Sequence, residues 1–259
     1  HNPGGVGRNI AHNLRLMGVP VKFLTAFGND IYANELRTSC AELGMDISDA
    51  VYTELPTSTY LYITDETGEM QLAVCDTDVA DSIDETYLRS KLEVLNQAAL
   101  VIFDGNLTEG SVQFLSENVT APLFADPVSS KKAQRLRGVL PKLHTFKPND
   151  IEAMHLTETE TPEDAARALV AMGMKRVFVS CGGNGIIAAE GGQMIHLPCE
   201  KTEIVNTTGG GDASMAALAW SFTQGLSLEQ SARAALKAGA IAVSAEETIA
   251  PDMAPERLL

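Results

Sequence analysis

The spacing of apolar residues predicts several helices along the chain. Residues 8–17 repeat Ile10, Leu14 and Met17 at the helical period, and Gly18 follows where a glycine can end a helix. A second helix, closed by Gly44, is predicted at Ile31–Leu43, and runs of small and apolar residues predict helices at Ser214–Trp220 and Leu228–Ser244. The short, mostly apolar segment Val21–Thr25 is predicted to be a strand.

A two-residue alternation replaces the helical period in Thr57–Thr64, where Tyr60 falls on one face and its neighbours on the other. The run Asp65-Glu66-Thr67-Gly68 then turns the chain into a second strand, Met70–Cys75. We therefore expect a β-hairpin inserted at about 51–77. Its alternation alone does not separate a free hairpin from an ordinary edge hairpin of the main sheet.

Strands and helices alternate after residue 98, and this order is typical of a parallel sheet with right-handed crossovers. The expected elements are strands at Leu100–Phe103, Leu123–Ala125, Arg176–Ser180 and Ile186–Ala189, a short strand after His144, and helices at Glu109–Asn118 and Lys131–Leu140. Because 259 residues with 45% apolar content can bury one large core, we expect a single α/β domain over 1–259.

Ligands of such sheets bind at the carboxyl ends of the strands. Asp104-Gly105-Asn106 and Asp126-Pro127 stand at two of these ends. Asn106 is a candidate substrate contact and Asp126 a candidate helper near a metal ion. Acidic residues that simply begin a loop would fit the same positions.

Three glycines, Gly209, Gly210 and Gly211, precede the helix expected at Ser214–Trp220. The N–H groups of a helix N-terminus carry the positive end of the helix dipole, so this stretch can bind a phosphoryl group without a lysine. Asp212 would repel such an anion unless it accepts a proton from an attacking hydroxyl. Stabilisation of the helix dipole is the alternative role.

Asn149 and Glu152 lie three residues apart at the start of another expected helix. Side chains at this spacing share one helical face and can meet hydrated magnesium or phosphate. A capping box has the same spacing and remains an alternative. A further glycine-rich turn, Cys181-Gly182-Gly183-Asn184-Gly185, follows the Arg176–Ser180 strand and by itself indicates only a hairpin.

The formal net charge of −15 argues against nucleic acid or an anionic membrane as a partner. No apolar run is long enough to span a bilayer and no signal peptide is visible. The four cysteines form no C-x-x-C pair, which favours free thiols in a reducing cytoplasm.

Two stretches resemble the signatures of the ribokinase-like (PfkB-type) carbohydrate kinases: GGVGRN at the start of the chain, and NTTGGGDASMAALA near its end. The segments TSTYLYITDETGEM, ADPVS and HTFKPN look most like kinases of this family that act on pseudouridine. The resemblance implies a three-layer αβα fold with a mainly parallel central sheet, and an inserted hairpin that forms a lid over the substrate and pairs with its twin in a homodimer. It also implies ATP and Mg²⁺.

Site residues follow from the same resemblance. Asp212 is the expected general base, with Gly209, Gly210 and Gly211 as the anion hole. The expected substrate contacts are Gly5, Arg8, Asn9, Tyr60, Asn106 and Asp212, although Asn9 has helix capping as an alternative. The expected nucleotide contacts are Lys147, Asn149, Ser180, Gly182, Gly183, Gly185, Gly209 and Gly211. Asn149 and Glu152 are expected to meet magnesium through water.

The chain departs from the family pattern at three places. Asn206 stands where the family usually has an aspartate that, with Thr208, helps to bind a monovalent cation, so K⁺ binding is uncertain from sequence. Val6 replaces the lysine of ribokinase, which argues against ribose. Residues 1–3 leave no room for the family's first strand and its substrate-binding aspartate, and we expect that strand to be absent from the sequence shown.

Three alternatives remain at this stage. The first is a kinase of the same family for ribose, fructose, adenosine or another nucleoside. The second is a relative that binds a nucleoside but has lost activity. The third is a dinucleotide-binding oxidoreductase, which the absence of a G-x-G-x-x-G run around Gly209 disfavours.

Overall fold

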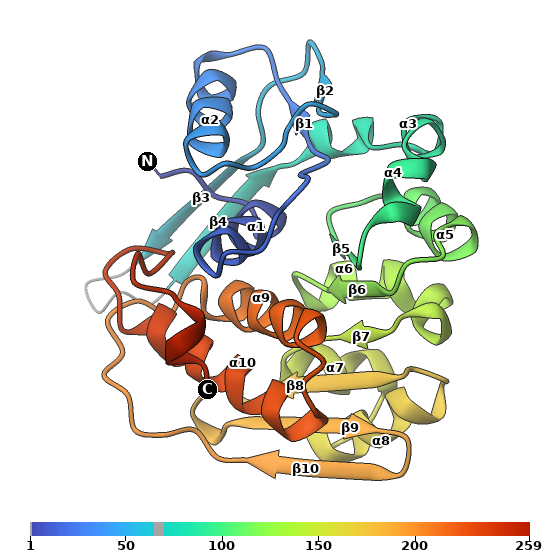
Figure 1. The fold of residues 1–259 in the computed structure, drawn as a ribbon, viewed down its shortest axis with the longest axis vertical. Coiled ribbons are helices and arrows are strands. Elements are labelled where there is room, and N and C mark those ends of the chain that lie inside the picture. Colours follow the sequence, from blue (N-terminus) through green and yellow to red (C-terminus); the bar gives the residue numbers. More distant parts are fainter. Residues whose placement is uncertain (1, 65–69) are drawn as a thin grey trace.

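A six-stranded sheet runs through the computed structural model, which describes residues 2–64 and 70–259 (Figure 1). Its strands, in spatial order, are β10 (Gln193–Leu197), β9 (Ile186–Glu190), β8 (Arg176–Ser180), β7 (Thr145–Phe146), β6 (Leu123–Asp126) and β5 (Val101–Asp104). The pairs from β5 to β8 are parallel, and β9 and β10 are antiparallel. The mainly parallel sheet expected from the sequence is confirmed.

Helices cover both faces of this sheet. Because β5 to β8 are added in one direction, right-handed crossovers put their connecting helices on one face. These are α5 (Glu109–Asn118), α6 (Ser130–Ala133), α7 (Asp150–Thr157) and α8 (Pro162–Ala171); the other face carries α1 (Val6–Leu16), α9 (Gly210–Thr223) and α10 (Leu228–Val243). Leu123 and Ala125 of β6 pack in the hydrophobic core under α5–α8, and Phe124 packs in the core under α1, α9 and α10. The three-layer architecture is therefore as predicted.

Helices α9 and α10 pack closely through small side chains. Alanines of both helices are fully buried between them, and a Cβ built on Gly239 would lie only 2.9 Å from Ser214 Oγ. The predicted helices at 8–17, Ile31–Leu43, Ser214–Trp220 and Leu228–Ser244 are all present, with ends that shift by a few residues.

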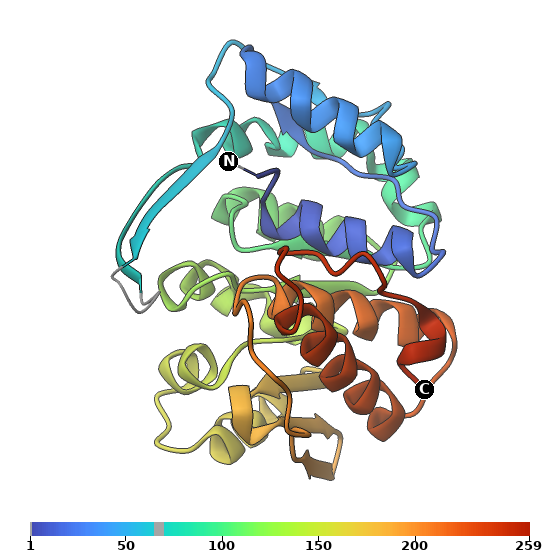
Figure 2. The ribbon, with the colours of Figure 1, turned by 90° about the vertical axis from the view of Figure 1, so that its left-hand side faces the viewer.

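The inserted hairpin forms a sheet of its own. Strands β3 (Thr59–Thr64) and β4 (Met70–Asp76) pair antiparallel and do not join the central sheet. Figure 2 shows the hairpin along one side of the molecule, and in Figure 1 its strands run past α1 toward the left edge of the view. An edge hairpin of the main sheet is thereby excluded; the predicted turn at Asp65–Gly68 lies outside the described residues.

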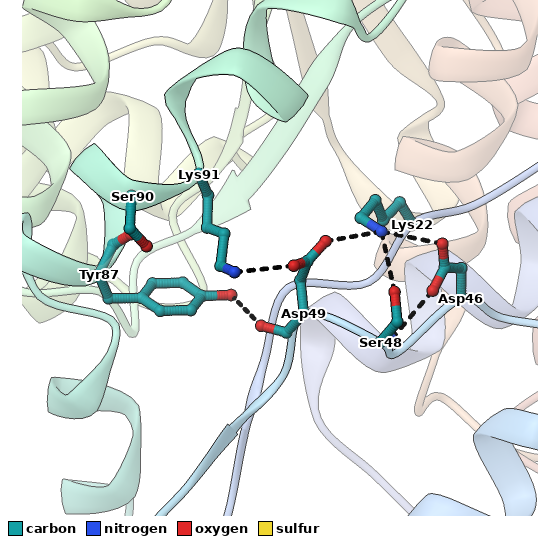
Figure 3. Close-up of polar contacts among 7 residues, drawn as sticks. All are labelled: Lys22, Asp46, Ser48, Asp49, Tyr87, Ser90 and Lys91. Atoms are coloured by element: carbon teal, nitrogen blue, oxygen red, sulfur yellow. Dashed lines mark hydrogen bonds and ion pairs between the residues drawn. The ribbon is translucent and has the colours of Figure 1, made fainter.

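A polar network connects helix α3 (Glu85–Ser90) with the segment around Lys22, which comes after α1 in the chain (Figure 3). Lys22 Nζ lies 2.6 Å from Asp49 Oδ2, and Lys91 Nζ lies 2.8 Å from Asp49 Oδ1. The Tyr87 hydroxyl donates to the Asp49 carbonyl at 2.7 Å. This network anchors the unit made of α2 (Ile31–Glu42), β1 (Ala26–Phe27) and β2 (Val51–Tyr52).

Two predicted elements differ from the structure. Val21–Thr25 is not a strand: its backbone makes a single bridge at Lys22, and the ladder proper begins only at Ala26. Of the helix expected at Lys131–Leu140, α6 covers only the start, and a 3₁₀ helix, Gln134–Lys142, continues it. Pro141 lies inside that second helix and has no N–H to donate to a longer α-helix.

Three helices were not predicted: α3, α4 (Leu92–Gln97) and α8. The first two are only six residues long, too short to display a clear period. Within residues 2–64 and 70–259, no helix combines the length and apolar content that crossing a membrane requires.

Candidate active site

The glycine run predicted as an anion hole is the start of α9. Gly209 caps the helix in the left-handed conformation with φ 88°, and Ala213 N–H donates to the Gly209 carbonyl at 2.9 Å. No side chain caps this end among the described residues. The first N–H groups of α9, those of Gly210 and Gly211, precede any intrahelical bond and can serve an anion.

Close packing also requires these glycines. A Cβ on Gly209 would lie 2.1 Å from the Thr248 carbonyl oxygen, and one on Gly210 would lie 2.9 Å from Val243 Cγ1. One on Gly211 would lie 3.5 Å from Lys147 Nζ. The backbone of this turn thus lies directly against α10, the segment after it and a buried ammonium group.

Asp212 follows in the first turn of α9, partly exposed. Asn9 Nδ2 of α1 donates to Asp212 Oδ2 at 2.8 Å, across 203 residues of sequence. Burial raises the pKa of Asp212 from 3.8 to about 7; Asn9 and Lys147 oppose the rise, and Asp126 and Asp104 add to it. A carboxylate with this pKa can accept a proton near neutral pH.

Behind the glycines lies a buried ion pair that the sequence did not reveal. Lys147 Nζ lies 3.1 Å from Asp126 Oδ2, and the two side chains are only 5% and 9% exposed. Burial opposes the charge on Lys147, but Asp126, Glu152 and Asp212 together raise its pKa. Lys147, predicted as a nucleotide contact, is therefore a permanent cation beside the α9 N-terminus.

Asp104 joins α1 to the end of β5. Its Oδ2 accepts from Gly7 N–H at 3.0 Å, and its Oδ1 accepts from Asn106 N–H at 2.8 Å. The Asn106 side chain meets Lys132 Nζ through its oxygen. Burial raises the pKa of Asp104. Residue Asp104 was noted only as part of a strand end, and the substrate role of Asn106 stays a prediction.

Asn149 and Glu152 form the complete capping box of α7. Asn149 Oδ1 accepts from Glu152 N–H, and Glu152 Oε2 accepts from Asn149 N–H, both at 2.8 Å. Glu152 is 7% exposed, and burial raises its pKa. The capping box, which was the alternative to a metal site at this spacing, is thus present. The box uses one carboxylate oxygen of Glu152, so metal binding stays a prediction.

The glycine turn after β8 lies beside this box, since Ser180 pairs with Asn149 in an isolated bridge. A Cβ on Gly185 would lie 2.0 Å from the Leu197 carbonyl, so the contact with β10 alone explains that glycine. Gly182 has a positive φ of 52°, and Gly183 faces open space. Contacts of Ser180, Gly182, Gly183 and Gly185 with a nucleotide remain predictions.

The residues of α1 and its start that were predicted to contact the substrate have different partners in the structure. Gly5 caps the helix with φ 100°. Arg8 donates to Ser39 Oγ of α2 at 2.6 Å, and its Nε has no partner among the described residues. Asn9 Oδ1 is buried and also unpaired there, next to the Asp212 contact. Tyr60 of β3 is 57% exposed.

Asn206 does not fit the monovalent cation that the resemblance suggested. Its Oδ1 accepts from Thr208 N–H at 2.9 Å, and its Nδ2 donates to the Glu246 carbonyl at 3.2 Å. A donor nitrogen therefore occupies the side on which a cation would need an oxygen ligand. Thr208 contributes its N–H to this contact, and a cation role for its oxygen atoms stays a prediction.

Comparisons with known proteins identify the family of this chain. The model of the pfkB family of carbohydrate kinases matches residues 1–255. Pseudouridine kinase of Escherichia coli K12 is 35% identical over 262 residues, which cover 97% of this chain and 83% of that protein.

Solved structures share the fold. Ribokinase of Thermotoga maritima superposes with a TM-score of 0.88 at 22% identity, over 99% of this chain and 86% of that one. Ribokinase of Arabidopsis thaliana, complexed with ribose and ATP, gives 0.83 at 22% identity, over 97% and 84%. The ribokinase-like fold is confirmed and the oxidoreductase alternative is wrong. The chain belongs to the PfkB family of carbohydrate kinases, and is a sugar or nucleoside kinase that transfers a phosphoryl group to a hydroxyl.

Proposed function

We propose that this kinase transfers the γ-phosphoryl group of ATP to the 5′-hydroxyl of a nucleoside, and that the nucleoside is pseudouridine. The observation that carries the reaction is the pairing of Asp212 with the uncapped N-terminus of α9. The choice of substrate rests on the 35% identity to a pseudouridine kinase and on the segments noted in the sequence.

In this mechanism Asp212 accepts the proton of the 5′-hydroxyl as the hydroxyl oxygen bonds to phosphorus and the bond to ADP breaks. The transition state of phosphoryl transfer is loose, so the proton leaves late and a carboxylate of ordinary basicity suffices. Asn9 holds Asp212 in place through its Nδ2. Its unpaired Oδ1 is an acceptor that a sugar hydroxyl can satisfy.

The backbone N–H groups of Gly209, Gly210 and Gly211 stabilise the negative charge on the transferred phosphoryl oxygens. Donors of this kind contribute about 10² to 10³ in rate each. Lys147, a short distance behind Gly211, adds a fixed positive charge in a site with little water. These two features let a chain with a net charge of −15 bind an anion.

Magnesium fits the carboxylate oxygens around Glu152 and Asp126, with Asn149 nearby. Within residues 2–64 and 70–259, no group of three or more His, Cys, Asp or Glu side chains could hold a metal by itself. Mg²⁺ usually keeps several waters and binds one or two carboxylates plus substrate phosphates, which suits this sparse set. Bound there, the ion would neutralise charge on the ATP phosphates.

We also propose that the hairpin closes over the nucleoside and pairs with that of a second copy. Leu61 and Ile63 of β3 stand opposite Val74 and Leu72 of β4, and all four side chains are at least 55% exposed. So much apolar surface on one face of a two-stranded sheet is typical of an interaction site. Sedimentation of the protein should give a dimer, and Leu61→Ser should give a monomer.

The cysteines described in the structure are all free, which fits the cytoplasmic location expected from the sequence.

Release of ADP, measured across pseudouridine, uridine, adenosine, ribose and fructose, tests the substrate. The highest kcat/KM is expected with pseudouridine. A higher value for ribose or fructose would make the protein a sugar kinase, and no turnover of any compound would leave only a nucleoside-binding relative.

A further inference from the structure

The loop that leads into the α9 N-terminus is fastened to the end of α10 by its own hydrogen bonds. The N–H groups of Val205 and Asn206 both donate to the Val243 carbonyl, at 2.8 and 3.1 Å. Three residues after Asn206 the chain reaches Gly209, where an added Cβ would lie only 2.1 Å from the Thr248 carbonyl oxygen. The residues from Val243 to Thr248 therefore support the glycines from below.

The Asn206 side chain adds two further hydrogen bonds to the two backbone bonds at Val243. Its Oδ1 accepts from Thr208 N–H at 2.9 Å, and its Nδ2 donates to the Glu246 carbonyl at 3.2 Å. The two partners fix the orientation of the amide, because a flipped side chain would oppose two donors at Thr208 and two acceptors at Glu246. The donor side of Asn206 must therefore face Glu246.

We propose that the Asn206 amide takes the place of a bound monovalent cation, so that the anion hole forms without potassium or sodium. This inference rests on the proposed kinase function. A cation between the loop and the Glu246 carbonyl would need oxygen ligands on both sides. Here the Asn206 N–H group, with its partial positive charge, lies next to that carbonyl in place of the cation. Asn206 is then a positioning residue that acts on the reaction through Gly209.

The wild-type enzyme gives the first test. Its kcat and KM for ATP should be the same in KCl, NaCl and choline chloride at equal ionic strength, with ATP added as a salt free of alkali cations. Its thermal unfolding midpoint should also be the same in KCl and choline chloride. A clear activation by K⁺, or a higher midpoint in K⁺ only, would overturn the inference.

The variant Asn206→Asp gives the second test. It replaces the donor by an oxygen, so a carboxylate then faces the Glu246 carbonyl and a cation is needed between them. In choline chloride, kcat should fall about tenfold, the scale of one lost hydrogen bond together with repulsion, and KCl should restore it. The unfolding midpoint of this variant should rise with KCl, which reports binding without any turnover.

Asn96→Asp is the matched control. Asn96 lies in α4, and its Oδ1 accepts from Thr120 N–H at 2.7 Å, as Asn206 Oδ1 does from Thr208. The substitution adds the same charge far from the glycines and should create no dependence on K⁺. An Asn206→Asp enzyme that is as active in choline as the wild type would refute the inference.

If no nucleoside or sugar is phosphorylated, the proposed function fails, but the unfolding midpoints still test Asn206. If turnover is normal and depends on K⁺ in the wild type, only the Asn206 inference fails. The two outcomes are therefore separable.

Discussion

Replacing Asp212 by asparagine should greatly lower kcat and at the same time stabilise the protein. Asn removes the proton acceptor but keeps the size and a hydrogen-bond acceptor for Asn9 Nδ2. General-base contributions are about 10² to 10⁴, so kcat should fall by at least about a hundredfold while ATP binding stays close to normal. An enzyme that keeps more than about a tenth of its activity would remove Asp212 from the role of base.

The gain in stability follows from the raised pKa of Asp212. A carboxyl whose pKa rises from 3.8 to about 7 on folding holds its proton more tightly in the native state, so its contribution to stability is lost as pH rises through this range. A shift of about three units corresponds to at most about 4 kcal/mol above pH 7, and partial exposure reduces that figure. Asn pays no such cost.

The measurement is thermal unfolding at two pH values. At pH 8 the Asp212→Asn variant should unfold several degrees above the wild type, since about 1 kcal/mol shifts the midpoint of a chain of this size by about 2–4 °C. At pH 5, where Asp212 is protonated, the difference should shrink. Equal midpoints at both pH values would mean that Asp212 is not held in a costly environment. The kcat/KM of the wild type should also fall about tenfold per pH unit below 7.

Three further outcomes are expected. Gly210→Val should raise the KM for ATP and lower kcat, because the added side chain clashes with Val243 and must displace the backbone N–H groups of the helix start; unchanged steady-state kinetics would contradict the anion hole. Lys147→Met should move the acid limb of the kcat/KM profile to higher pH, since Lys147 lowers the pKa of Asp212, and an unmoved limb would exclude that coupling. Asp49→Ala should lower the free energy of unfolding by about 1 kcal/mol in urea without changing kcat, because it breaks both lysine contacts. Since these contacts lower the pKa of Asp49, the loss should shrink progressively as the pH falls below about 4 and vanish only below the lowered pKa; a loss that persists in strong acid would point to packing instead.

Elements with local signals could be predicted from the amino-acid order alone. Apolar spacing and glycine stops indicated α1 and α2, Ala-rich apolar runs indicated α9 and α10, and the alternation around Tyr60 indicated the hairpin. These signals suffice because period and glycine conformation depend only on neighbouring residues. Val21–Thr25 shows the limit, since an apolar segment becomes a strand only where a partner is aligned with it, and here the paired ladder begins only at Ala26, opposite Val51.

Only the tertiary structure decided how the site is assembled. The contact of Asn9 with Asp212 joins residues 203 positions apart, and no spacing rule pairs Lys147 with Asp126 or aims the Asn206 amide at Glu246. For Asn149 and Glu152 the same spacing serves a capping box and a metal site alike. The raised pKa of Asp212 likewise comes from burial and from charges on other strands, which exist only once the sheet and helices have packed together.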